Sequence, residues 1–184
     1  MSDTNFPPEN ATPNGSGNNP SGNPGQAGAA PQGPLLLNLQ YTKDLSFEVP
    51  GAPELFATMR EPPRIDLALD VQARPLQQDQ NVFEVALQIR ADAQTNGPDG
   101  KPQTAFIAEL VYCGIFTVNV EPNMVEPLLL VECPRLLFPF ARNILADVTR
   151  DGGFPPVLLS PIDFVALWQS RRGQPGGAAA APQA

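Results

Sequence analysis

Residue types able to carry out catalysis are scarce in this chain. It has 184 residues, of which two are cysteines (Cys113 and Cys133) and none is histidine. Without an imidazole, Ser-His and Cys-His nucleophile pairs and histidine-ligated zinc sites are excluded. A cysteine nucleophile also needs a neighbouring cation to lower its pKa, and only Arg135 lies close to either cysteine in sequence. We therefore expect two buried or interface thiols in a protein that is not an enzyme.

Carboxylates are the remaining candidates for chemistry. Asp44 and Glu48 are four residues apart, which on a strand rising roughly 3.3 Å per residue places them about 13 Å apart. Acid–base catalysis needs a cleft around such a pair, and the sequence does not indicate one. Asp66, Asp70 and Asp79 lack the loop spacing of a metal site, and no phosphate-binding glycine motif is present. We expect no metal and no cofactor.

Charge and hydropathy exclude further classes. The net charge is −8, from 11 basic and 19 acidic residues, so the basic footprint of a nucleic-acid-binding protein is missing. No signal peptide opens the chain, and no run approaches the roughly 20 apolar residues that span a bilayer. Two cysteines could pair, but so few favour reduced thiols in a reducing compartment. We expect a soluble cytoplasmic protein without direct membrane insertion.

Composition divides the chain into three parts. Residues 1–34 contain seven prolines, six glycines and six asparagines, and such a segment buries too little apolar surface to offset its ordering entropy. Residues 173–184 have a similar composition. We expect a disordered Pro/Gly/Asn-rich leader (1–34), a folded domain (35–172) and a disordered tail (173–184). Removing the leader should change the stability little.

The folded part opens with alternating residues typical of antiparallel strands. From Leu35 to Val49 the odd positions, Tyr41 and Lys43 included, are assigned to the buried face, and the even positions to the polar face. Similar patterns predict strands over 65–71, 82–93 and about 104–118, with a hairpin-type turn at 95–100. On the last strand Ile107 and Glu109 share the less core-like side.

Helical spacing follows the strands. Pro134 is a candidate helix start, and apolar residues recur from Leu137 to Val148 until Gly152 and Gly153 end the helix. A second helix is predicted from Ser160, as an N-cap followed by Pro161. The pattern predicts an α+β fold: a four-stranded antiparallel sheet followed by two helices.

Two surfaces remain as functional candidates. The outward side of the first strand, with Asp44 and Glu48, could continue into that of the fourth as an acidic plane, although acids on a strand face often serve solubility alone. The connection 50–63 carries Leu55, Phe56 and Met59 among polar residues. Long connections are often functional, so these side chains indicate an oligomer interface or a peptide-binding groove, unless they only pack in the core.

Four colinear segments resemble the protein-export chaperone SecB family. Together they span roughly 37–172, essentially the whole predicted domain. The segments are YTKDLSFEVPGAPELF (41–56), DQNVFEVALQI (79–89), TAFIAELVYCGIF (104–116) and ECPRLLFPFARNILADVTRDGGFPPVLLSPIDFVALW (132–168). The resemblance implies a homotetramer, assembled as a dimer of dimers with helices between the sheets.

The resemblance also implies a function. SecB-like proteins are ATP-independent chaperones that hold unfolded precursor proteins in a translocation-competent state and deliver them to the SecA translocase ATPase. In this sequence the family's SecA contact matches Asp44, Glu48, Ile107 and Glu109. Its client groove matches, less specifically, Leu55, Phe56, Met59, Phe154 and Phe164. Two alternatives stay open: a SecB-like chaperone with a different client, such as an antitoxin, or an acidic oligomeric domain without client function.

Overall fold

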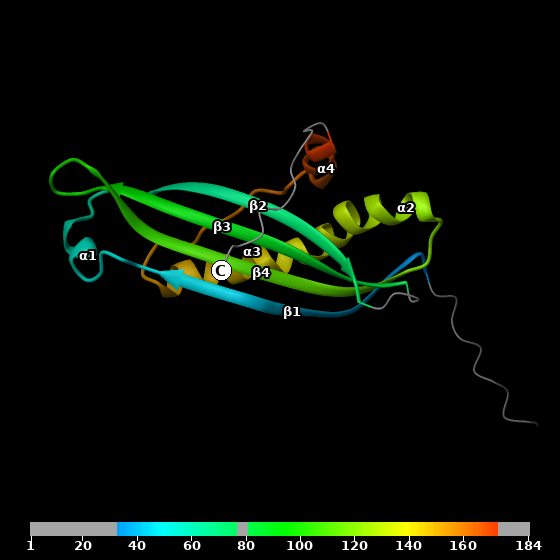
Figure 1. Cartoon of the computed structure of the whole chain (residues 1–184). Helices are drawn as coiled ribbons and strands as arrows, with labels where there is room; N and C mark the ends of the chain where they lie inside the picture. The colour runs from blue at the N-terminus through cyan, green and yellow to red at the C-terminus, as the bar shows by residue number, and fades with distance from the viewer. Residues whose placement is uncertain (1–32, 77–80, 173–184) are drawn as a thin grey trace, which may run out of the picture. The chain divides into compact units, whose positions relative to one another are not determined.

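A computed structural model describes residues 33–76 and 81–172 (Figure 1). The predicted tail and all of the predicted leader except Gly33 and Pro34 lie outside the described residues. Four strands form one antiparallel sheet, as the alternation predicts, and their order in it is β1-β4-β3-β2. β2 extends beyond both of its predicted ends, β3 beyond its predicted end and β4 beyond its predicted start. The strands are β1 (Leu35–Glu48), β2 (Arg64–Pro75), β3 (Val82–Asn96) and β4 (Pro102–Val118).

The predicted strict alternation along β1 is wrong in its middle. The pairing of β1 with β4 shifts between Leu37 and Leu39 and again between Thr42 and Asp44. Each shift inserts an extra residue, as in a β-bulge, and so reverses which side chains face the core. Tyr41 therefore lies opposite Cys113 on the side away from the core, and Lys43 is on that side as well.

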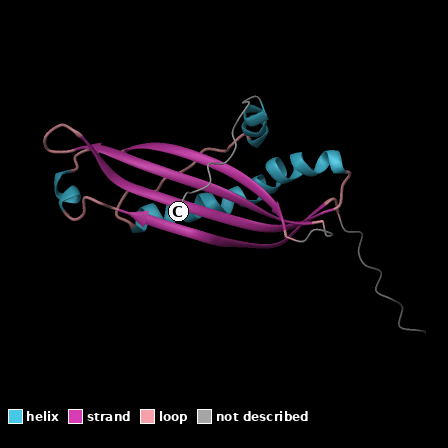
Figure 2. Ribbon diagram, in the orientation of Figure 1, coloured by secondary structure: helices cyan, strands magenta, loops and turns pink. Residues whose placement is uncertain are grey.

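The predicted helix at Pro134 begins earlier. Three consecutive segments run without a break, and in Figure 2 they are drawn as helix behind the strands. Cys133 N donates to the Leu128 carbonyl, a π-type bond, and Pro134, which follows, has no N–H to donate. The segments are α2 (Pro122–Pro127), the π-helix η1 (Leu128–Glu132) and α3 (Cys133–Asp151).

Gly152 and Gly153 end α3, as predicted. Gly153 has φ +88°, a left-handed conformation that favours glycine, and its N–H donates to the Arg150 carbonyl. The chain then reaches α4 (Phe164–Arg172). Its predicted cap at Ser160 is wrong, because Asp163 Oδ1 accepts hydrogen bonds from the N–H groups of Val165 and Ala166, both at 3.0 Å.

The core lies between α3 and one face of the sheet. Side chains at alternate positions of β4, such as Phe106 and Leu110, are buried together with Leu137 and Leu145 of α3. A Cβ on Gly114 would lie 2.9 Å from Leu137 Cδ2, so this glycine allows α3 to approach the sheet closely. The opposite face of the sheet is free to carry polar groups.

The connection between β1 and β2 is more ordered than a plain loop. It contains a short helix, α1 (Glu54–Thr58), whose Leu55 is buried in the core.

At the other end of the chain, Arg171 of α4 contacts the edge of β2. Its guanidinium donates to the carbonyl oxygens of Val71 at 3.1 Å and Leu69 at 3.3 Å.

Candidate functional site

The face of the sheet opposite α3 is called the open face below. It is built by alternate residues of β2, β3 and β4 and, because of the two register shifts, by an irregular set from β1. By the pairing register its members include Leu39, Tyr41, Lys43, Asp44, Ser46, Glu48, Arg64, Asp66, Ala68, Asp70, Gln72, Arg74, Val82, Glu84, Ala86, Gln88, Arg90, Asp92, Ile107, Glu109, Val111, Cys113, Ile115 and Thr117.

The four residues predicted to contact SecA lie together on the open face. Glu48 is directly opposite Ile107, and Asp44 is opposite Val111, two residues beyond Glu109. Asp44 and Glu48 are exposed, while Ile107 and Glu109 are half-buried. Glu48 and Glu109 thus lie next to Ile107, and Asp44 lies at the other end of the patch, next to Val111. The structure brings the predicted set together in one patch.

Arginine neutralises part of this patch. Arg90 donates to both carboxylate oxygens of Asp92 at 2.8 Å and also pairs with Glu109 across the β3–β4 ladder. These hydrogen bonds hold the pKa of Asp92 below its usual range. In the described part of the chain, Asp44 and Glu48 have no ion-pair partner. They are the carboxylates most available to a partner.

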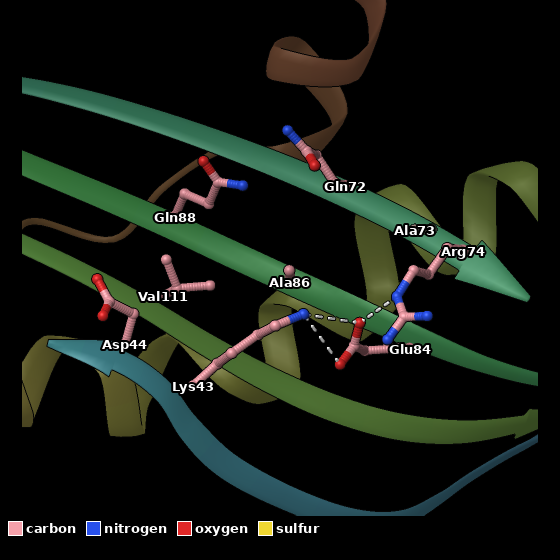
Figure 3. Close-up of a pocket in the computed structure, with 9 residues that line it drawn as sticks. All are labelled: Lys43, Asp44, Gln72, Ala73, Arg74, Glu84, Ala86, Gln88 and Val111. Carbon is pink, nitrogen blue, oxygen red and sulfur yellow. Dashed lines mark hydrogen bonds and ion pairs between the residues drawn. The ribbon is translucent and has the colours of Figure 1, made fainter. Parts of the chain in front are cut away.

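A second charged group on the open face is centred on Glu84. Only 4% of its surface is exposed, and its carboxylate accepts from Arg74 Nε at 2.5 Å and from Lys43 Nζ at 3.2 Å (Figure 3). It also accepts from the Tyr41 hydroxyl. The hydrogen bond from Arg74, with those from Tyr41 and Lys43, lowers the pKa of Glu84 to about 2. The hydrogen bond from Tyr41 to Glu84 raises the pKa of the Tyr41 hydroxyl to about 12.

The sequence pattern does not predict this group. Strict alternation turns Tyr41 and Lys43 toward the core, away from Glu84, and the shift between Leu37 and Leu39 is what brings them to the open face. The available signal is an acid, Glu84, inside the otherwise apolar segment 82–87, because a buried carboxylate there requires cations on neighbouring strands.

Two adjoining depressions mark the open face. Their volumes are about 310 Å³ and about 320 Å³, and they share Asp44, Gln88 and Val111. The Glu84 depression is also bordered by Lys43, Gln72, Ala73, Arg74, Glu84 and Ala86. The acidic depression is also bordered by Ala68, Leu69, Asp70, Ile89, Arg90, Glu109 and Leu110. Asp44 therefore stands at the boundary between them.

The residues predicted to line a client groove are only partly at the surface. Phe56 is 43% exposed and Met59 is half-buried, whereas Leu55, Phe154 and Phe164 are buried. Phe56 packs on Phe154, with ring centroids 5.3 Å apart. Phe164 instead packs against Phe138 of α3, at 5.9 Å, so it does not belong to the same aromatic group.

Neither cysteine is an activated nucleophile. Cys113 and Cys133 are free and buried, as predicted, and burial raises the pKa of both thiols, that of Cys133 to about 12. Within residues 33–76 and 81–172, no cluster of three or more acidic or cysteine side chains could hold a metal ion. No helix in the same ranges has the length and apolar character needed to cross a membrane.

The fold defines the class of protein. It is the α+β fold of a SecB-like chaperone: the structure superimposes on a SecB-like chaperone of Mycobacterium tuberculosis with a TM-score of 0.54 and 14% identity. The match covers 70% of this chain and 90% of that one, which was solved with a peptide from an antitoxin.

Sequence comparison identifies the family. The family model for SecB, the preprotein translocase subunit, matches residues 28–175. The Protein-export protein SecB of Acidiphilium cryptum is 60% identical over 153 residues, which are 78% of this chain and 92% of that protein. That of Gluconacetobacter diazotrophicus is 49% identical over 181 residues, covering 95% and 96%. The chain belongs to the SecB family.

Proposed function

We propose that the protein is an ATP-independent cytoplasmic chaperone that holds unfolded precursor proteins and delivers them to the SecA translocase for export. The observation that carries this proposal is 46–62% identity to proteins named Protein-export protein SecB. The antitoxin peptide belongs to a structure only 14% identical, which is a likeness of fold alone. Export is therefore preferred to antitoxin binding.

SecA binds, in this proposal, to the patch of Asp44, Glu48, Ile107 and Glu109. Glu48 and Glu109 lie next to Ile107, and Asp44 extends the patch along β1. The two carboxylates on β1 carry no ion pair among the described residues. A basic receptor surface gains electrostatic attraction from the acids and a smaller apolar contact from Ile107. Docking of this kind weakens with salt, because exposed charges are screened.

The client binds at the surface around α1. Phe56 and Met59 present apolar side chains there, and Leu55 and Phe154 are buried beside them. Phe164, the first residue of α4, is buried and supports this surface from within the core. Many weak, sequence-tolerant contacts suit an unfolded chain, and several such surfaces on one assembly raise the effective concentration. Binding the unfolded state then keeps a client from folding by mass action, without any covalent step.

The assembly is a homotetramer, a dimer of dimers. On α3, Leu137 is buried within the chain, but Phe140 and Leu136 are exposed by 46% and 45%. Strand β1 is an edge strand and also carries exposed leucines, at positions 36, 39 and 45. An exposed apolar helix face and an unpaired strand edge both favour burial against another copy.

Mass measurement in solution, with and without an unfolded precursor, tests holding and assembly together. A tetramer that forms a complex with the precursor, prevents its aggregation and then binds SecA is the expected result. A monomer that leaves the precursor to aggregate at an equimolar ratio would contradict the proposal. Copurified proteins would identify a different client, such as an antitoxin.

A further inference from the structure

The cations around Glu84 have capacity for a second anion. Arg74 uses only Nε in its bond to Glu84, and its two terminal amino groups have no hydrogen bond within the described residues. The side chains of Arg74 and Lys43 are 60% and 47% exposed, whereas that of Glu84 is 4% exposed. Two cations therefore share one buried carboxylate. Asp44 is the fourth charged residue of the lining, so the charges balance overall, but the free terminal amino groups of Arg74 remain available to an acceptor.

The neighbouring depression is acidic. Asp44, Asp70 and Glu109 border it, and Arg90 is the cation of its lining. Asp70 also pairs with Arg171 of α4. Asp44 borders both depressions, and Figure 3 shows it at the side of the first depression away from Arg74. Lys43 and Arg74 thus lie in one depression and the excess of acids in the other, so the open face is not uniformly acidic.

We propose that the depression bordered by Lys43 and Arg74 is a carboxylate subsite, occupied by an Asp or Glu side chain of the protein that docks on the open face. The fork of Arg74 suits a carboxylate, because parallel N–H groups can donate to both of its oxygens. The subsite fixes the orientation of the partner, whose basic residues lie over Asp44, Glu48 and Glu109 and whose acid lies over Lys43 and Arg74.

A polyanion such as RNA or an anionic lipid surface fits this subsite poorly. Its further negative charges would extend over Asp44 and the adjoining acidic depression, where they are repelled. A single carboxylate next to basic residues, as on the surface of a folded protein, satisfies both halves. Glu84 acts as a positioning residue, because it holds Lys43 and Arg74 side by side from two strands that are not neighbours.

The test measures the affinity of the full-length protein for SecA at low ionic strength and asks whether Arg74→Gln weakens or tightens it. The test rests on the proposed function. If SecA places a carboxylate here, Arg74→Gln should weaken binding by about 3- to 10-fold. Arg74→Lys should restore part of the affinity.

Arg64→Gln is the matched control. It removes the same charge from the same strand but borders neither depression, so its effect should stay within about twofold. If the face were recognised only as an acidic surface, Arg74→Gln would tighten binding, which overturns the subsite. If the wild-type protein does not bind SecA at all, the proposed function fails as well. If the wild-type protein binds SecA, and Asp44→Lys weakens this binding but Arg74→Gln does not, only the subsite is overturned.

Discussion

Glu48 and Ile107 lie directly opposite each other across the β1–β4 ladder, on the open face of the sheet. A charged side chain and a β-branched apolar one thus form a single cross-strand pair, with Glu109 two residues along β4. In such a patch the apolar side chain supplies contact area at the centre, and the acids around it guide the encounter with a basic partner. Its shape depends on the second register shift in β1.

Asp44→Lys tests the docking patch directly. Asp44 is exposed and has no ion pair in the described ranges, so its reversal should leave the fold and the tetramer intact. We expect SecA affinity to fall by about 5- to 10-fold at low salt, measured by calorimetry. In about 1 M salt, where the Debye length is about 3 Å, the difference should nearly vanish.

Glu109→Lys should weaken docking in the same direction, although it also removes the pair with Arg90. Glu121→Lys makes the same charge change at the start of α2, away from the open face, and serves as the control. Unchanged affinity of the Asp44 and Glu109 variants at low salt, or an equal loss with the Glu121 variant, would remove the docking assignment.

Phe56→Ser tests the client surface. Phe56 is exposed by 43% and packs on Phe154, so the serine removes apolar surface next to α1 at a modest cost in stability. The variant should suppress the aggregation of an unfolded precursor less well, and a light-scattering assay measures this. Met124→Ser removes a similarly exposed side chain, 49% exposed, from α2 and should retain full activity. Equal activity of both variants would exclude Phe56 from the client surface.

The Glu84 group should make stability depend on pH in acid. Its pKa is lowered to about 2 in the folded state, so ionised Glu84 stabilises the fold fully above its unfolded pKa of about 4.5. This contribution is lost as the pH falls from about 4.5 to 2, and it amounts to roughly 1 to 3 kcal/mol.

Glu84→Gln lacks that contribution at every pH. Urea unfolding should therefore show a large difference between wild type and variant at pH 6, and a smaller one near pH 2.5. Glu61→Gln, at an exposed position in the β1–β2 connection, is the control and should change little at either pH. A difference for Glu84→Gln that is the same at both pH values would show that its ionisation does not stabilise the fold.

Thr149 is expected to anchor the segment after α3. Its buried hydroxyl donates to the Leu145 carbonyl at 2.9 Å and accepts from the Val157 N–H at 3.0 Å. Thr149→Val leaves that N–H buried without a partner, so the free energy of unfolding should fall by about 1 to 3 kcal/mol. Thr149→Ser keeps the hydroxyl and loses one methyl group, so the free energy of unfolding should fall by about 1 kcal/mol. Urea unfolding at one fixed chain concentration compares them, and an equal loss would contradict the role of the hydroxyl.

Local pattern predicts much of the architecture. The alternation in β2, β3 and β4 places Phe106 and Leu110 on the core side and Glu109 on the other, as observed. The helical spacing after Leu137 and the glycine pair at its end predict α3 and its last turn. These elements follow from periods of 2 and 3.6 residues, which are properties of neighbouring residues in the sequence. The α2 segment, by contrast, carries prolines at both of its ends and no such periodic signal.

What the sequence determined by itself is the family, the α+β class and the grouping of Asp44 and Glu48 with Ile107 and Glu109. Only the tertiary structure decided where Tyr41 and Lys43 point and which predicted groove residues are exposed. The physical reason is that a bulge is set by the register between strands far apart in the chain: Glu84, 43 residues from Tyr41, receives its hydroxyl only after β1 has shifted against β4. Likewise, burial of Phe154 and Phe164 depends on aromatic partners from other elements, which no local period encodes.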